Sequence, residues 1–304
     1  MAMTSDNFIE RSLLKRKLNS WRVISVVVII LLLLSFIGKN SNISSGGNDY
    51  IARISFHDVI EDDRKIYDLI DEVADDKHVK AVILEMDTPG GVAVAGEAIF
   101  NKIIMLKKQK PVVVSMRSVC ASAGYMISVA ADRIYAMNGT ITGSIGVILQ
   151  SAELSKLAKK IGITPITIKS GELKGNPSIA EPISEKSRET LQEMIDELHL
   201  TFVKMVAINR KIDEDKVKII ADGRVYSANK ALKLGLIDEI GDENDALKWL
   251  QKNKNISTDL EIFDVEIKKD FNQTFAEITG MSSLPFFRNS SFSSRLMLIW
   301  QPEL

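Results

Sequence analysis

The sequence of 304 residues contains a single cysteine, Cys120, and only three histidines. One thiol cannot form an intramolecular disulfide, so the fold depends on packing rather than on crosslinks. A zinc site built from several cysteines is excluded for the same reason. Because His57, His78 and His199 follow no metal-ligand spacing, we expect no metal site.

The chain also lacks an excess of either charge. Its 39 Lys and Arg residues balance 40 Asp and Glu residues, which gives a formal net charge of −1. Proteins that bind nucleic acids usually carry a basic face, and the balanced total gives no support for one. We therefore expect no nucleic-acid partner. Contents of 45% hydrophobic and 26% charged residues are ordinary for a globular protein.

One long hydrophobic run departs from this ordinary composition. Residues 23–38 contain no charge, and a helix of that length rises about 24 Å, compared with about 30 Å for a hydrocarbon core. Trp21, Arg22 and Lys39 flank the run and suit a membrane interface. A cleaved signal peptide is the alternative, but no small-x-small cleavage site directly follows the run. The pattern therefore predicts a transmembrane anchor over residues 22–39.

The charges around this run predict its orientation. Five basic residues precede it, whereas only two follow it closely. By the positive-inside rule, residues 1–21 remain in the cytoplasm and the rest of the chain is extracytoplasmic.

Composition also divides the chain beyond the anchor. Residues 40–49 consist largely of Ser, Asn and Gly and read as a flexible linker. We place the main domain at 50–253 and a C-terminal extension at 254–304. The last part of the extension, 281–304, is rich in Ser, Phe and Leu. It either docks on its own domain or contacts a neighbouring subunit or the membrane surface.

Strands and helices alternate through the main domain. Period-two alternation and short apolar runs predict strands, whereas apolar residues spaced by three and four predict helices. The predicted strands are 51–56, 79–87, 111–117, 133–137 and 163–170, and the predicted helices are 63–76, 94–109, 123–131, 183–212, 214–221 and 227–234. This rhythm indicates an α/β domain with βαβ units and a largely parallel sheet.

Three short segments carry residues suited to catalysis. In residues 87–91 (DTPGG), a glycine N–H after a predicted strand can point at an oxyanion, although such a sequence is often a simple turn. Ser122 lies between a predicted strand and a predicted helix, where a serine is either an exposed nucleophile or an N-cap. Lys174 lies between Gly171 and Gly175, either in a surface loop or as an amine that accepts a proton in a closed site.

Together and in this order, the three segments resemble the signal peptide peptidase A (SppA) family, also called protease IV, in its short single-domain form. Residues 142–147 (TGSIGV) and the stretch 222–241 support the resemblance, which covers about residues 50–250. It implies a Clp protease/crotonase-like fold of repeated ββα units behind an N-terminal transmembrane helix. It also implies a homo-oligomer in the cell inner membrane, with the catalytic domain in the periplasm and no cofactor.

The resemblance also implies roles for individual residues. Ser122 is the nucleophile and Lys174 the general base of a Ser–Lys dyad, which Ser144 orients. The backbone N–H groups of Gly91 and Ala123 form the oxyanion hole. The implied substrates are remnant signal peptides and other envelope proteins, hydrolysed without a metal.

The chain departs from the family pattern at three places. Ala123 stands where glycine commonly follows the nucleophile, Asp87-Thr88 stands where Asn-Ser is usual, and Gly175 stands where aspartate is common. These differences leave the dyad intact and bear on substrate preference. Two other functions fit the same fold: a crotonase-type acyl-CoA enzyme, which the anchor disfavours, and an inactive interaction module, which the intact dyad disfavours.

Overall fold

The computed structural model describes three parts of the chain, residues 21–28, 47–266 and 297–299. The chain divides into two units, 1–47 and 48–304. In the first unit, residues 21–28 are helical. Within the described parts, no helix is both long enough and apolar enough to cross a membrane. The predicted anchor extends through residues 29–39, which lie outside the described residues, so it stays a prediction.

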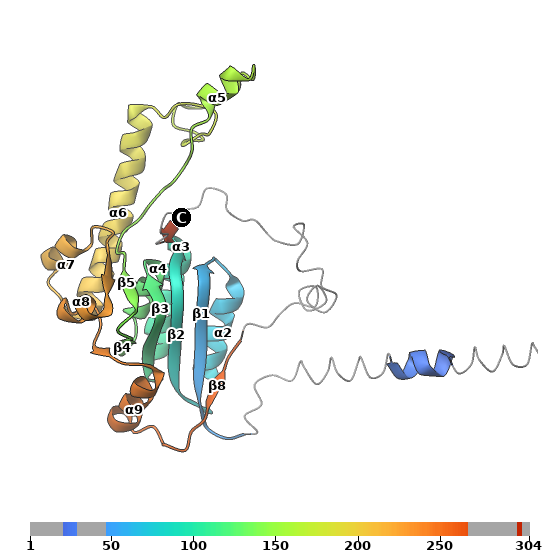
Figure 1. Cartoon of the computed structure of the whole chain (residues 1–304), viewed down its shortest axis with the longest axis vertical. Helices are drawn as coiled ribbons and strands as arrows, with labels where there is room; N and C mark the ends of the chain where they lie inside the picture. Colours follow the sequence, from blue (N-terminus) through green and yellow to red (C-terminus); the bar gives the residue numbers. More distant parts are fainter. Residues whose placement is uncertain (1–20, 29–46, 267–296, 300–304) are drawn as a thin grey trace, which may run out of the picture. The chain divides into compact units, whose positions relative to one another are not determined.

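A mixed sheet forms the centre of the larger unit (Figure 1). Its main path runs in the order β6-β5-β3-β2-β1-β8. The bounds are β1 (Tyr50–Ile60), β2 (Val79–Val92), β3 (Val112–Ala121), β5 (Ile141–Gly143), β6 (Val225–Ser227) and β8 (Ile262–Asp264). Three further strands leave this path: β4 (Arg133–Ala136) pairs with β3 and with β7 (Glu239–Ile240), and β9 (Met297–Ile299) pairs with β2. Among the described pairs, β5–β6 and β2–β9 are antiparallel and the others are parallel.

Alternating side chains of the strands build a separate core on each face of the sheet. Val82 and Leu84 of β2 lie in the larger core, to which α2 (Arg64–Asp75), α3 (Ala93–Lys107), α4 (Ala123–Ser128) and α6 (Glu185–Arg210) contribute residues, as do α7 (Glu214–Ile220) and α8 (Ala228–Lys233). Ile83 lies in the smaller core with Ala246 and Leu250 of α9 (Glu243–Lys254). Because successive strand residues point to opposite faces, one apolar run fills both cores. In contrast to these helices, α5 (Ser155–Lys160) has no buried residue.

The largely parallel α/β sheet agrees with the sequence prediction, but the predicted strand at 163–170 is wrong. These residues form neither strand nor helix. Ile166 and Ile168 are 85% and 95% exposed, and this segment pairs with no described strand although apolar and polar residues alternate along it. A period of two describes a strand only where an edge is available to pair with it.

β2 extends through Pro89, where the sequence predicted a stop. The register between β1 and β2 shifts after Asp87 and resumes at Gly90, so Pro89 has no partner on β1. A proline is tolerated at such an irregularity because it has no N–H to leave unpaired. The strand therefore continues through Gly90–Val92, beyond the end of its pairing with β3 at Thr88.

Tyr125 attaches α4 to the segment that precedes β7. Its side chain is fully buried, and its hydroxyl donates a 2.8 Å hydrogen bond to the carbonyl of Leu236. We expect Tyr125→Phe to lower the free energy of unfolding by about 1–2 kcal/mol, because the buried carbonyl loses its partner. Urea unfolding measures the change. The control is Tyr67→Phe, which removes a hydrogen bond to Asp62 at the surface and should cost less than about 0.5 kcal/mol. Equal losses would contradict the assignment.

Candidate active site

Ser122 joins β3 to α4 in a strained turn. Its backbone has φ 55° and ψ −117°, a conformation that residues other than glycine rarely adopt and that costs on the order of 1–3 kcal/mol. The Ser122 N–H donates to Gly143 at 2.8 Å, and its carbonyl accepts from Met126 at 2.9 Å. The side chain makes no N-cap hydrogen bond. A sharp strand-to-helix turn of this kind presents a nucleophilic serine at the end of a sheet.

Thr88 holds the end of β2 against the start of α4. A Cβ atom added at Gly124 would lie 2.5 Å from Cγ2 of Thr88, so glycine is required where the two segments meet. The buried Thr88 hydroxyl also accepts the N–H of Gly90 at 3.1 Å. Asp87 accepts the N–H of Val119 on β3 at 3.0 Å. Asp87 and Thr88, the two residues that differ from the usual Asn-Ser of the family, therefore have structural roles that the sequence did not reveal.

Gly91 lies where β2 passes closest to β1. A Cβ atom at this position would lie 2.0 Å from the carbonyl oxygen of Ile60, so a side chain cannot fit. The β1–β2 ladder pairs these two residues. The opposite edge of β2 is the one that pairs with β3 up to Cys120, two residues before Ser122. The Gly91 backbone therefore borders the serine turn.

The methyl group of Ala123 packs against α3. Ala123 is fully buried, and a Cβ atom added at Gly96 would lie 3.1 Å from the Cβ atom of Ala123. Gly96 thus provides the room that an alanine after the serine requires. The N–H of Ala123 is in the first turn of α4, where backbone donors have no acceptor within the helix. The departure from glycine at this position leaves that donor in place.

The structure brings Ser144 next to Ser122. β3 and β5 run parallel with Ala121 opposite Gly143, and each serine immediately follows the last residue of its strand. Adjacent strands lie about 4.8 Å apart, so the two serines leave the sheet side by side. Ser144 is buried, with a positive φ of 49°.

The stretch 222–241 supports this pair of strand ends. The carbonyl of Arg224 accepts the N–H of Ser144 at 2.9 Å. A Cβ atom at Gly143 would lie 2.7 Å from a ring carbon of Tyr226, so glycine lets the ring close over β5. Within the stretch 222–241, Arg224 and Tyr226 therefore help to position the segment that carries Ser144.

Cys120 is close to Ser122 in sequence but is an unsuitable nucleophile. The thiol is completely buried, and its sulfur lies 3.2 Å from Oγ of Ser128. Burial raises the pKa of this thiol to about 12. Because the thiolate is the reactive form, Cys120 is inert in the folded protein.

Lys174 lies apart from the other predicted site residues. It is exposed in a turn between α5 and α6, where its N–H donates to Gly171 at 3.1 Å. No hydrogen bond among the described residues joins Lys174 to Ser122 or Ser144. Figure 1 shows α5 and the start of α6 standing away from the sheet, and α6, with its 26 residues, is about 39 Å long. The residues that the structure describes therefore do not give Lys174 the burial that a lysine base needs.

The segment that carries Lys174, residues 151–184, is called the arm below. It exposes a concentration of large apolar side chains: Leu154, Leu157, Ile161, Ile163, Ile166, Ile168, Leu173 and Ile179. Lys169 and Glu181 pair within the arm, and this hydrogen bond lowers the pKa of the Glu181 carboxyl. A concentration of exposed apolar side chains on a protruding segment is typical of a site of protein association.

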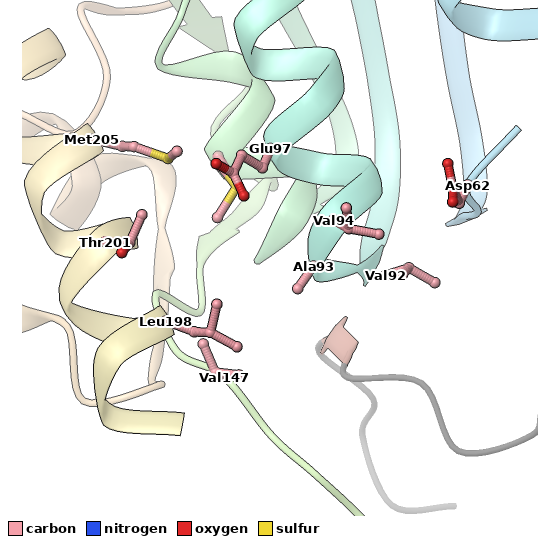
Figure 2. Close-up of a pocket in the computed structure, with 10 residues that line it drawn as sticks. Asp62, Val92, Ala93, Val94, Glu97, Val147, Leu198, Thr201 and Met205 are labelled. Atoms are coloured by element: carbon pink, nitrogen blue, oxygen red, sulfur yellow. The ribbon is translucent and has the colours of Figure 1, made fainter. Parts of the chain in front are cut away.

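A pocket of about 510 Å³ lies between the N-terminal part of α3 and α6 (Figure 2). Three lining residues lie close in sequence to the candidate site residues. Val92 follows Gly91, Met126 lies one turn after Ser122, and Val147 lies three residues after Ser144. Leu198 and Met205 of α6 close the opposite side, and Glu97 and Asp62 are the acidic residues of the lining. The pocket suits a mainly apolar side chain.

Comparison with known proteins identifies the class of the chain. Residues 104–257, which include Ser122, Ser144 and Lys174, match peptidase family S49. The putative protease MJ0651 of Methanocaldococcus jannaschii is 38% identical over 241 residues, covering 75% of this chain and 78% of the relative. These matches define a serine peptidase, and the chain belongs to peptidase family S49, the family of SppA and protease 4.

Other relatives are longer than this chain. A putative signal peptide peptidase SppA of Enterococcus faecium is 39% identical over 200 residues, or 66% of this chain and 57% of the relative. Protease 4 of Haemophilus influenzae is 35% identical over 78% of this chain and 37% of its own length. Among solved structures, a mutant of the 1510-N membrane-bound stomatin-specific protease is 20% identical, with a TM-score of 0.47 and coverage of 73% of this chain and 100% of that chain.

The contact between Ala123 and Gly96 is testable by a double-mutant cycle. We expect Gly96→Ala to destabilise the protein by about 1–3 kcal/mol through overpacking, less the roughly 1 kcal/mol by which alanine favours a helix over glycine. Combining it with Ala123→Gly removes the collision, so the double variant should recover most of the loss. Urea unfolding of the four proteins gives the coupling energy. Additive effects would show that the methyl group does not face α3.

Proposed function

We propose that this chain is a membrane-anchored serine endopeptidase with Ser122 as nucleophile and Lys174 as general base. The observation that carries the proposal is the conformation of Ser122, a buried serine in a strained turn at a strand end, with no capping role. Strain of this kind persists only where the surrounding structure enforces it, and it is concentrated at functional sites. Membership of peptidase family S49 supplies the reaction class.

The proposed mechanism is nucleophilic. A neutral Lys174 accepts the proton of Ser122, and the serine oxygen attacks the carbonyl carbon of the scissile peptide bond. The N–H groups of Gly91 and Ala123 stabilise the oxyanion, at on the order of 3–4 kcal/mol for each donor. The amine protonates the leaving group and then activates the water that hydrolyses the acyl-enzyme. Ser144, beside Ser122 at the next strand end, positions the amine.

Lys174 reaches Ser122 in this proposal through association with a second copy. A general base must lie about 2.6–3.2 Å from the hydroxyl it deprotonates, whereas Lys174 is exposed on the arm. The arm also exposes the apolar side chains that an interface between subunits would bury. A homo-oligomer in which the arm of one copy covers the serine turn of its neighbour satisfies both requirements.

The proposed substrates are remnant signal peptides and other envelope proteins. The pocket between α3 and α6 is mainly apolar, which suits the hydrophobic segment of a signal peptide. An anchor at 22–39, with residues 1–21 in the cytoplasm, would hold the domain at 50–253 on the periplasmic face of the inner membrane, close to such peptides. Coenzyme A thioesters are cytoplasmic, so this location disfavours the acyl-CoA alternative.

A mixing experiment tests the dyad and its assembly together. We expect Ser122→Ala and Lys174→Ala each to abolish hydrolysis of a signal-peptide-like substrate by the full chain. When the two inactive variants are combined and reassociated, sites that pair the intact serine of one copy with the intact lysine of another should form, at about a quarter of all sites in a random mixture. Fluorogenic peptide hydrolysis measures the recovery.

The matched control replaces Lys169 instead of Lys174. Lys169 lies on the same arm but pairs with Glu181, so Lys169→Ala should keep most of the activity. Equal activity of the wild type and the Ser122→Ala and Lys174→Ala variants would contradict the dyad. Loss in both single variants without recovery on mixing would place both groups of each site in one chain.

A further inference from the structure

The pocket between α3 and α6 combines apolar walls with a few polar side chains. The walls consist of aliphatic side chains and the thioethers of Met126 and Met205. The polar side chains of the lining are Asp62, Glu97 and Thr201. A volume of about 510 Å³ accommodates a long side chain. In an apolar pocket, the few polar groups determine which ligand fits best, so these three side chains carry the information on specificity.

Glu97 brings an unpaired carboxylate to this pocket. Figure 2 shows its side chain extending from α3 toward Met205 of α6. Among the residues that the structure describes, none forms a hydrogen bond or an ion pair with the carboxylate. Lys102, the next basic residue along α3, pairs with Asp71 instead. The Glu97 carboxylate is exposed, so water hydrates it until a ligand enters the pocket.

The other two polar side chains also present hydrogen-bond acceptors. The Thr201 hydroxyl donates to the carbonyl of Glu197 at 3.0 Å, so only its lone pairs remain for a ligand. Asp62 accepts the hydroxyl of Tyr67 at 2.8 Å and keeps further acceptor positions. The described lining includes neither lysine nor arginine. A ligand that satisfies these groups must therefore supply N–H donors and a positive charge at the end of an apolar stem.

Lysine and arginine side chains have this composition. Their methylene stems pack on apolar surfaces, and their charged ends are hydrogen-bond donors without acceptors. An apolar side chain of the same length would cover the Glu97 carboxylate without giving it a partner, which is unfavourable. We propose that this pocket binds a lysine or arginine side chain of the peptide substrate, and that Glu97 selects it. The claim that the bound peptide is then hydrolysed rests on the proposed function.

The inference narrows the class of proposed substrates. Val92 directly follows the proposed oxyanion donor Gly91, so a side chain in the pocket belongs to a residue close to the scissile bond. The hydrophobic segment of a signal peptide satisfies the apolar walls but has no cation for Glu97. Segments of envelope proteins in which a basic residue lies among apolar ones satisfy both, so they are the preferred substrates.

A set of fluorogenic peptides tests this preference with the full-length chain. In an apolar peptide, one position at a time carries lysine or norleucine, which has an apolar stem of similar length and no ammonium group. We expect a higher kcat/KM for lysine at one position near the scissile bond. Glu97→Gln keeps the shape and removes the charge, so it should lower the lysine-to-norleucine ratio at that position by about fivefold. Glu97→Lys should favour glutamate there instead.

The matched control is Glu193→Gln. It removes the same charge from α6 at a position outside the pocket lining, so it should leave the lysine-to-norleucine ratio unchanged. An equal decrease in both glutamine variants would assign the preference to the overall charge of the protein and overturn the role of Glu97. A ratio that Glu97→Gln leaves unchanged at every position would also overturn it.

A binding measurement separates this inference from the proposed catalysis. In the Ser122→Ala background, the fluorescence anisotropy of labelled lysine and norleucine peptides reports binding without turnover. We expect the lysine peptide to bind about fivefold more tightly, and Glu97→Gln to remove the difference. If this result is obtained but no peptide is hydrolysed by the parent chain, the proposed activity fails and the inference stands. If peptides are hydrolysed and neither rate nor binding depends on Glu97, the inference fails and the proposed activity stands.

Discussion

β3 pairs with β2 as far as Cys120, and two residues later the chain turns at Ser122 into α4. The positive φ of that turn is unfavourable and is held by fixed contacts on three sides. The Ser122 N–H bonds to Gly143 on β5, Gly124 meets Thr88 on β2, and Ala123 meets Gly96 on α3. The same turn ends the pairing of β3 with β2, so the nucleophile lies where Gly90–Val92 of β2 pair with β9 instead of β3.

The protein divides the proposed catalytic groups between a packed body and a protruding arm. Ser122, Ser144, Gly91 and Ala123 belong to strand and helix ends fixed by buried contacts, whereas Lys174 belongs to a segment with an exposed apolar surface. If the base arrives only when arms and bodies of different copies meet, peptide hydrolysis depends on assembly.

The body of the fold could be predicted from the sequence because its strands are long and apolar. The run 79–87 fills two cores at once, which gives it a strong signal. Predictions from short local patterns failed where the secondary structure depends on neighbouring strands. Pro89 continues a strand because β1 shifts register there, and residues 163–170 alternate without a strand to pair with.

The site shows the same division between local and non-local information. The place of Ser122 between a strand and a helix could be predicted because a strand, a run of small residues and a helix follow one another locally in the chain. Three features could not be predicted. They are the contact of Ala123 with Gly96, the hydrogen bond from Gly90 to Thr88, and the separation of Lys174 from Ser122. Each depends on how segments that are distant in the sequence pack together. The sequence alone also does not determine where the arm lies relative to Ser122.

The central claim, that Ser122 is the nucleophile, is tested most directly by trapping the acyl-enzyme. A peptide ester with a good leaving group needs little help from a base to acylate the serine, whereas deacylation needs the lysine. The Lys174→Ala variant should therefore accumulate an adduct that intact-protein mass spectrometry detects and peptide mapping places on Ser122. An adduct on another residue, or the same adduct after Ser122 is also replaced by alanine, would contradict the account.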